Sequence, residues 1–139
     1  MSLRESRQVI VEQPATTIDV TSTGDKKTFV IPFPCTVLRV GFMVTTALSV
    51  TALVLEFDRR QLPGSDTGRG AGDVGIITAP AAAQAAGRTL YDDVQFDMKG
   101  GEEVVVETTT ATTAGAGYPF LEIVPRAEEP GNDSEFISS

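Results

Sequence analysis

Apolar side chains recur at every second position along much of this chain, which is the period of a β-strand with one buried face. The longest such run covers residues 35–46, with Leu38, Val40, Phe42 and Val44 on the expected core face and Arg39, Gly41 and Met43 on the other. Residues 50–60 and 90–98 repeat the pattern, with expected core residues Leu53, Leu55, Phe57, Leu90, Val94, Phe96 and Met98. Asp92 is the one charged residue at an inward position of the 90–98 run.

Shorter segments predict further strands at residues 9–12, 18–21, 28–33, 74–79, 102–109 and 118–124. The Lys-Gly-Gly turn at residues 99–101 predicts that the strands on either side of it form a β-hairpin. Residues 80–86 begin with proline, continue with alanine and glutamine, and are followed by Gly87, which predicts one short helical turn.

Short strands at regular spacing, without an alternation of strands and helices, predict an all-β fold. We expect a single-domain jelly roll or β-sandwich of about eight antiparallel strands. A chain of 139 residues has room for one well-packed core. The expected domain spans residues 14–126, preceded by an N-terminal arm at residues 1–13 and followed by a flexible, polar C-terminal tail at residues 127–139.

The charge pattern argues against nucleic acid as a partner. Nineteen acidic and eleven basic residues give a net charge of -8, and the basic residues are scattered instead of clustered as phosphate binding requires. No apolar stretch reaches the length of about 20 residues that a membrane helix needs, so no membrane partner is expected. The N-terminal residues lack the apolar core of a signal peptide, which predicts synthesis in the cytoplasm.

The composition also argues against catalysis. The chain contains no histidine, so a Ser/His/Asp system and a His-based metal site cannot be built. The single cysteine, Cys35, begins an apolar strand and is expected to be a small buried hydrophobic residue. We therefore predict no catalytic residues, no cofactor, no metal site and no small-molecule substrate.

Two acidic groups leave alternatives open. A carboxylate pair for glycoside hydrolysis could come from Asp92, Asp93, Asp97, Glu102 and Glu103, although most of these alternate with core residues, as solvent-facing side chains do. The Gly-rich residues 66–73, with an aspartate at each end, could surround a cation, but the spacing is not that of an EF-hand. The sequence does not decide whether this loop binds one.

The second half of the chain has a characteristic order of segments. These are Tyr91-Asp92-Asp93-Val94, the sequence Lys-Gly-Gly-Glu-Glu-Val-Val-Val-Glu at residues 99–107, the Thr-, Ala- and Gly-rich residues 108–117, and residues 119–126. In overall pattern, residues 29–126 resemble small jelly-roll proteins encoded among the structural genes of tailed bacteriophages, in particular capsid decoration (cement) proteins. The resemblance implies a homotrimer that binds the major capsid protein on the outside of the virion and stabilises the capsid.

The N-terminal arm is the first candidate for contact with such a partner, because an extended segment can add a strand to a neighbour's sheet. The candidate partner-binding residues are Leu3, Arg4, Arg7, Val9 and Val11 in the arm, and Arg59 and Arg60 at a strand end. The other interpretation of the arm is a frayed terminus. An alternative function is a carbohydrate- or receptor-binding β-sandwich module of a tail fibre or baseplate, although the chain has no tryptophan and only two tyrosines for gripping sugars.

Overall fold

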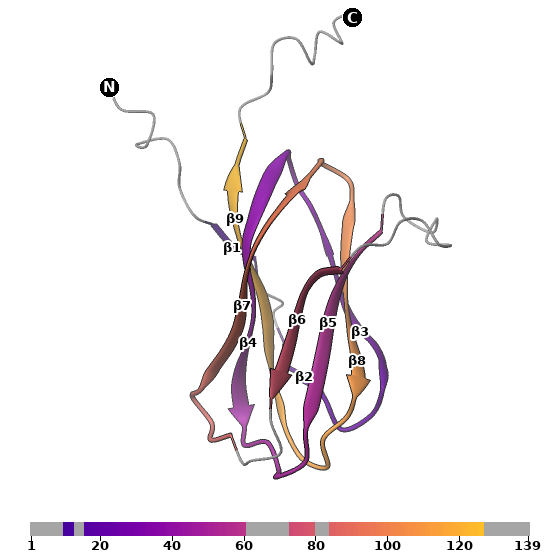
Figure 1. The fold of residues 1–139 in the computed structure, drawn as a ribbon, viewed down its shortest axis with the longest axis vertical. Helices are drawn as coiled ribbons and strands as arrows, with labels where there is room; N and C mark the ends of the chain where they lie inside the picture. Colours follow the sequence, from indigo (N-terminus) through magenta and orange to yellow (C-terminus); the bar gives the residue numbers. More distant parts are fainter. Residues whose placement is uncertain (1–9, 13–15, 61–72, 80–83, 127–139) are drawn as a thin grey trace, which may run out of the picture.

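The computed structural model describes residues 10–12, 16–60, 73–79 and 84–126, which form a sandwich of two antiparallel sheets (Figure 1). Its strands are β1 (Ile10–Glu12), β2 (Ile18–Asp19), β3 (Gly24–Val30), β4 (Cys35–Thr46), β5 (Leu53–Arg60), β6 (Asp73–Ala79), β7 (Thr89–Met98), β8 (Glu103–Thr110) and β9 (Ala116–Pro125). Sheet A has the order β1-β9-β4-β7, with β2 also paired to β9, and sheet B has the order β3-β8-β5-β6. The predicted all-β sandwich is confirmed.

The strand pairs are nested in the sequence. Strand β5 pairs with β6, β4 with β7, β3 with β8 and β2 with β9, so the chain resembles one long antiparallel ribbon that is rolled into two layers. The lateral pairs β4–β9 and β5–β8 complete the sheets. This nested pairing is the jelly-roll arrangement of a β-sandwich.

The core lies between the two sheets and follows the predicted alternation. Its largest fully buried side chains are Phe42, Phe57, Ile31, Leu53, Leu55, Met98, Leu121 and Ile123. Cys35 is also buried, as expected. Each large apolar side chain taken out of water contributes about 1.5–3 kcal/mol, so this packing is the main source of stability.

The prediction was wrong at one residue of β4. Leu38 was expected in the core, but it is half-buried and Val37 is fully buried instead. The register of β4 shifts between Val37 and Arg39 against both β7 and β9. A β-bulge adds one residue to the strand, so the core face moves from Val37 to Val40 without including Leu38.

The predicted hairpin at residues 99–101 is also wrong. Strand β7 belongs to sheet A and β8 to sheet B, so the connection crosses from one layer to the other. At the crossing, the backbone of Ile31 exchanges hydrogen bonds with Gly101 and Glu102, each with an N···O distance of 2.8 Å. Gly101 has a φ of 91°, which suits the turn.

The helical turn expected at residues 80–86 is absent from its described part, residues 84–86; residues 80–83 lie outside the described residues. Gln84 instead forms an antiparallel bridge with Leu48. The amide of Gly87 also donates to the carbonyl of Val44 at 2.7 Å. Pairing with the end of β4 thus uses the backbone groups that a helix would need, which overrides the helix propensity of alanine.

Asp92, the charged residue at an inward position, joins the two sheets along one edge. Its Oδ2 accepts a hydrogen bond from the amide of Ile76 in β6 at 3.1 Å. The neighbouring Gly75 lies so close to Val40 and Val94 that a Cβ atom there would meet their methyl groups. The carboxylate therefore provides an acceptor for an amide of edge strand β6, which would otherwise be open to another strand.

Arg126 fixes the end of β9. Its Nε donates to the carbonyl of Cys35 at 3.2 Å, and its Nη2 donates to the carbonyl of Met98 at 3.0 Å. These two carbonyls belong to β4 and β7, so a single guanidinium ties the end of β9 to two other strands of sheet A.

Hydroxyl groups hold two loops together at the other end of the sandwich. Thr112 is buried, and its Oγ1 lies 2.6 Å from Ser49 Oγ and 2.9 Å from Thr51 Oγ1. The amide of Thr113 donates to both of these hydroxyls at 3.1 Å. The β4–β5 and β8–β9 connections are thereby fixed to each other.

Candidate functional site

Most of the arm residues predicted to contact a partner, namely Leu3, Arg4, Arg7 and Val9, lie outside the described residues. Val11 is in β1, where its backbone is opposite Glu122 of β9 in the same chain. Residues 10–12 therefore extend the protein's own sheet A.

Arg59 and Arg60, the second predicted patch, occupy the end of β5. The guanidinium carbon of Arg59 lies 5.4 Å from the centre of the Phe96 ring, and its Nη1 is 4.0 Å from Glu102 Oε2. Its side chain is 31% exposed, so Arg59 packs against an aromatic ring and a buried carboxylate of its own chain. Arg60 is paired in register with Glu103, and its side chain is not among those described.

The carboxylates considered for glycoside hydrolysis have separate partners. Asp97 accepts from the hydroxyl of Thr36 at 2.7 Å, and Glu102 accepts from the amide of Lys99 at 2.8 Å. Asp93 pairs with Arg39, and Asp92 binds the β6 amide described above. Glu103 begins β8 and is buried in sheet B. The predicted acidic residues are therefore divided among sheet A, sheet B and the connection between them.

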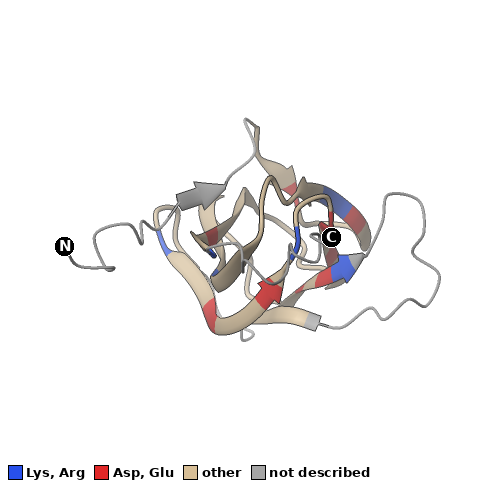
Figure 2. Ribbon diagram, turned by 90° about the horizontal axis from the view of Figure 1, so that it is seen from above, with Lys and Arg blue, Asp and Glu red and all other residues tan. Residues whose placement is uncertain are grey.

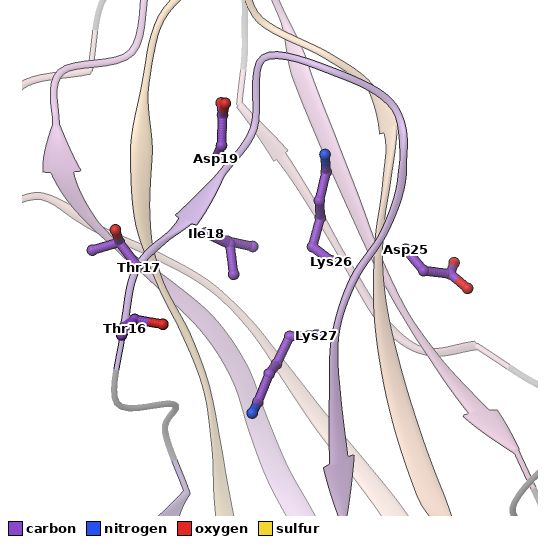
Figure 3. Close-up of a pocket in the computed structure, with 7 residues that line it drawn as sticks. All are labelled: Thr16, Thr17, Ile18, Asp19, Asp25, Lys26 and Lys27. Carbon is purple, nitrogen blue, oxygen red and sulfur yellow. The ribbon is translucent and has the colours of Figure 1, made fainter.

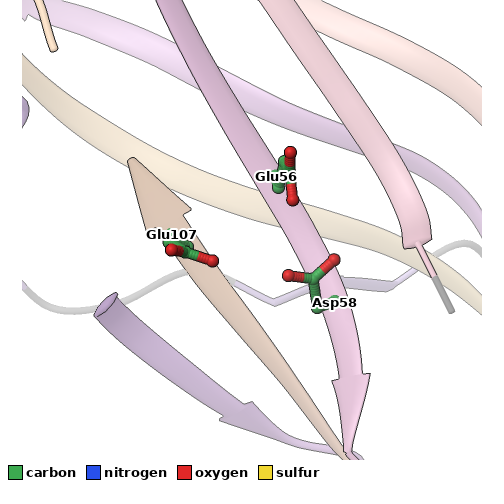
Figure 4. A group of neighbouring side chains, drawn as sticks. All are labelled: Glu56, Asp58 and Glu107. Carbon is green, nitrogen blue, oxygen red and sulfur yellow. The ribbon is translucent and has the colours of Figure 1, made fainter. Parts of the chain in front are cut away.

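Three other carboxylates meet on the outer face of sheet B (Figure 4). Glu56 and Asp58 lie on β5 and Glu107 on β8, with carboxylate oxygens within 4.8 Å of one another. The cluster has the oxygen ligands that divalent cations prefer. Acidic groups commonly gather on surfaces without binding an ion, and the cluster by itself does not establish a site. The predicted Gly-rich cation loop, residues 66–73, lies outside the described residues except for the backbone of Asp73.

An open depression of about 390 Å³ lies between β2 and β3 (Figure 3). It is lined by Thr16, Thr17, Ile18, Asp19, Asp25, Lys26 and Lys27. Lys26 donates to the Ser22 hydroxyl at 2.8 Å, and Asp19 Oδ1 accepts from both the amide and the hydroxyl of Thr21. These hydrogen bonds lower the pKa of the Asp19 carboxyl. The lining therefore contains two cationic and two carboxylate side chains. Their charges balance, so the depression has no net charge that would favour an anionic or a cationic ligand.

The outer face of sheet A has the most distinctive arrangement. The register of β7, β4 and β9 places side chains in rows across the three strands. These rows are Asp97–Thr36–Val124, Asp93–Arg39–Glu122, Tyr91–Gly41–Phe120 and Thr89–Met43–Tyr118. A charged row thus lies directly beside an aromatic row, and a row with methionine and tyrosine lies on the far side of the aromatic row. We call the last three of these rows the sheet A patch.

Because Gly41 has no side chain, the Phe120 ring can lie against the backbone of β4. A Cβ atom at this position would overlap three atoms of the Phe120 ring, so the ring lies across the glycine backbone. Phe120 is only 7% exposed, although it belongs to the solvent-facing side of the sheet. Stacking of an aromatic ring over a strand glycine is a known way to restore packing that the missing side chain would lose.

Arg39 is held in place from three sides. Its Nε lies 2.7 Å from Asp93 Oδ1, its Nη1 4.0 Å from Glu122 Oε2, and its guanidinium carbon 4.1 Å from the centre of the Tyr91 ring. The hydrogen bond to Asp93 raises the pKa of the guanidinium. The side chain therefore has a fixed position before any partner binds, which lowers the entropic cost of using it in an interface.

The sequence placed Arg39, Met43 and Tyr91 on the outward side of their strands but gave no reason to group them. Only the register between β7, β4 and β9 brings them beside Phe120. The available signal was Gly41 inside a strong strand pattern, since an isolated strand glycine often marks a close approach by another group.

The positive charges of the described residues occupy separate places around the sandwich (Figure 2). No helix in the described part of the chain is long and apolar enough to cross a membrane. No protein-family model matches the chain, and comparison with curated proteins gives no match.

Proposed function

We propose that this protein is a structural component of a tailed-phage virion that binds the exterior of the capsid as a homotrimer and stabilises it. In this role it acts by binding the major capsid protein and has no catalytic site. The proposal combines the sequence resemblance to decoration proteins with one observation on the fold, the sheet A patch.

The composition of the patch supports protein binding. Tyrosine, phenylalanine, methionine and arginine are enriched in protein interfaces, and they meet here on the central strands of a sheet. A surface held by packed strands and by the ion pairs of Arg39 loses little conformational freedom on binding. A repeating capsid lattice also strengthens a weak contact when several copies are joined in one oligomer.

The experiment uses capsids of the phage that encodes the chain, assembled without it. The full-length protein should co-sediment with these capsids and raise the temperature at which they release their contents. Analytical ultracentrifugation of the free protein should give the mass of a trimer. Absence of co-sedimentation at micromolar protein would reject the capsid role, and a monomeric mass would reject the trimer.

Tyr91 favours one second candidate, a carbohydrate-binding module. Tyr91 is 53% exposed, and its ring lies against Arg39, which is paired with Asp93; this combination of aromatic surface and charged hydrogen-bonding groups can hold a sugar. A glycan array with the full-length protein tests this function. Binding to a defined glycan that Tyr91→Ala abolishes would support it, and a blank array would exclude it for the glycans displayed.

A further inference from the structure

The sheet A patch has a charge imbalance that restricts what it can bind. Asp93 and Glu122 flank Arg39 in the charged row, and Asp97 lies on the same face beyond them. Within the four rows, the described strands therefore carry three carboxylates and one guanidinium beside the apolar rows. A partner surface with the opposite charges along its edge would complement it.

We infer that the sheet A patch is the surface that contacts the partner, and that the partner is a protein surface with an apolar centre bordered by lysine or arginine. This inference rests on the proposed function and adds the location and the chemistry of the contact. Met43 and Tyr91, which are 40% and 53% exposed, supply the apolar area that the contact would bury. The carboxylates of the charged row face the partner's cations.

Self-association through two such patches is the less favourable pairing. Two copies face to face would bring their carboxylates together, and like charges across an interface oppose association. The charge of the face thus favours a partner other than a second copy.

Sheet B provides control positions for a binding test of the sheet A patch. Its large exposed apolar residues, Val30 and Ile76, lie on the edge strands β3 and β6, whereas its central strands carry the acidic cluster of Figure 4. Val30 is 59% exposed and Ile76 38%, which match the exposures of Tyr91 and Met43. Alanine substitutions at these two pairs truncate two exposed side chains on each of the opposite sides of the sandwich.

The test compares two double variants of the full-length chain in co-sedimentation with capsids that lack the protein. Met43→Ala with Tyr91→Ala should weaken binding by about tenfold or more, because both side chains leave the centre of the contact. Ile76→Ala with Val30→Ala should bind within about twofold of wild type. Circular dichroism and urea unfolding establish that both variants are folded. Equal binding by the two variants would overturn the inference and leave the capsid role intact.

Photocrosslinking gives a result even if wild type does not bind capsids. Met43, or Ile76 as the control, is replaced by benzoylphenylalanine in phage-producing cells. A crosslink from position 43 to a partner peptide that adjoins a lysine or arginine supports the inference. If that peptide comes from a protein other than the capsid protein, the inference stands and the proposed capsid role fails. No crosslink from Met43, or one to a second copy of this chain, would overturn the inference. Binding that does not weaken as salt is raised would overturn the cationic border.

Discussion

Phe120 and Gly41 form a pair whose packing makes a quantitative prediction. A methyl group at position 41 would overlap the Phe120 ring, so Gly41→Ala must displace the ring from the sheet. Exposing a phenylalanine that is almost fully buried costs about 1.5–3 kcal/mol, while replacing a strand glycine by alanine returns about 0.5–1 kcal/mol. We therefore expect Gly41→Ala to lower the free energy of unfolding by about 1–2 kcal/mol.

The sign of this effect should reverse when the ring is absent. Phe120→Ala alone costs about 1.5–3 kcal/mol for the lost burial. In that background the methyl group at position 41 meets no ring, so Gly41→Ala should raise stability by about 0.5–1 kcal/mol through the lower entropy of the unfolded chain. The coupling energy of the double-mutant cycle should be about 2 kcal/mol.

Urea unfolding followed by circular dichroism measures all four proteins of this cycle. Gly117→Ala is the control, because the obstacle at position 117 is the backbone carbonyl of Met43, which Phe120→Ala cannot remove. Its cost should be the same with or without the ring. If the effects of Gly41→Ala and Phe120→Ala add to within about 0.5 kcal/mol, the ring does not rest on the glycine and the argument fails.

Three further substitutions test polar contacts of the fold by urea unfolding. Arg126→Gln should cost about 1–2 kcal/mol, because it removes two hydrogen bonds to strand carbonyls, and an unchanged midpoint would contradict their role. Asp92→Ala should cost about 1 kcal/mol and speed the hydrogen exchange of the Ile76 amide; unchanged protection would argue against that bond. Hydrogen bonds from the Thr21 hydroxyl and amide lower the pKa of Asp19 below its usual 3.8, so its stabilising contribution is present above that pH and is lost as the pH falls through the lowered pKa. Asp19→Asn should therefore reduce stability more near pH 7 than in acid below the lowered pKa, and an equal loss under both conditions would refute this.

The fold class could be predicted because the two-residue period is local. Residues Leu53, Leu55 and Phe57 alternate without interruption, and all three are fully buried. The same period does not say which strand lies beside which. Strands β7 and β8 have the same pattern whether they pair with each other or belong to different sheets, so a turn signal alone could not distinguish the two.

The errors at single residues have a similar cause. The bulge at Leu38 is a property of β4 together with both of its neighbours, because the register shifts against β7 and β9 at the same place. Gln84 lies in an alanine-rich segment that favours helix locally, but its backbone pairs with Leu48. In both cases contacts between distant segments decide the local structure.

The sheet A patch also depends on which strands pair with each other. Tyr91, Gly41 and Phe120 are far apart in the sequence and form one row only through two strand pairings. The sequence instead predicts Arg59 as a patch residue, because it ends a strand next to another arginine. The structure places that side chain over Phe96, where it covers an edge of its own core.

The charged side chains are arranged differently on the two outer faces of the sandwich, and this difference favours sheet A as the binding surface. On sheet B, Glu56 lies directly opposite Glu107, and like charges in that position destabilise a sheet. On sheet A, Arg39 lies between two carboxylates, so the charges of its row already attract one another. A partner of sheet A therefore needs to complement only the remaining negative charge while it covers the aromatic row. A partner of sheet B would have to neutralise clustered carboxylates, and the large exposed apolar side chains of the described part of sheet B lie on its edge strands.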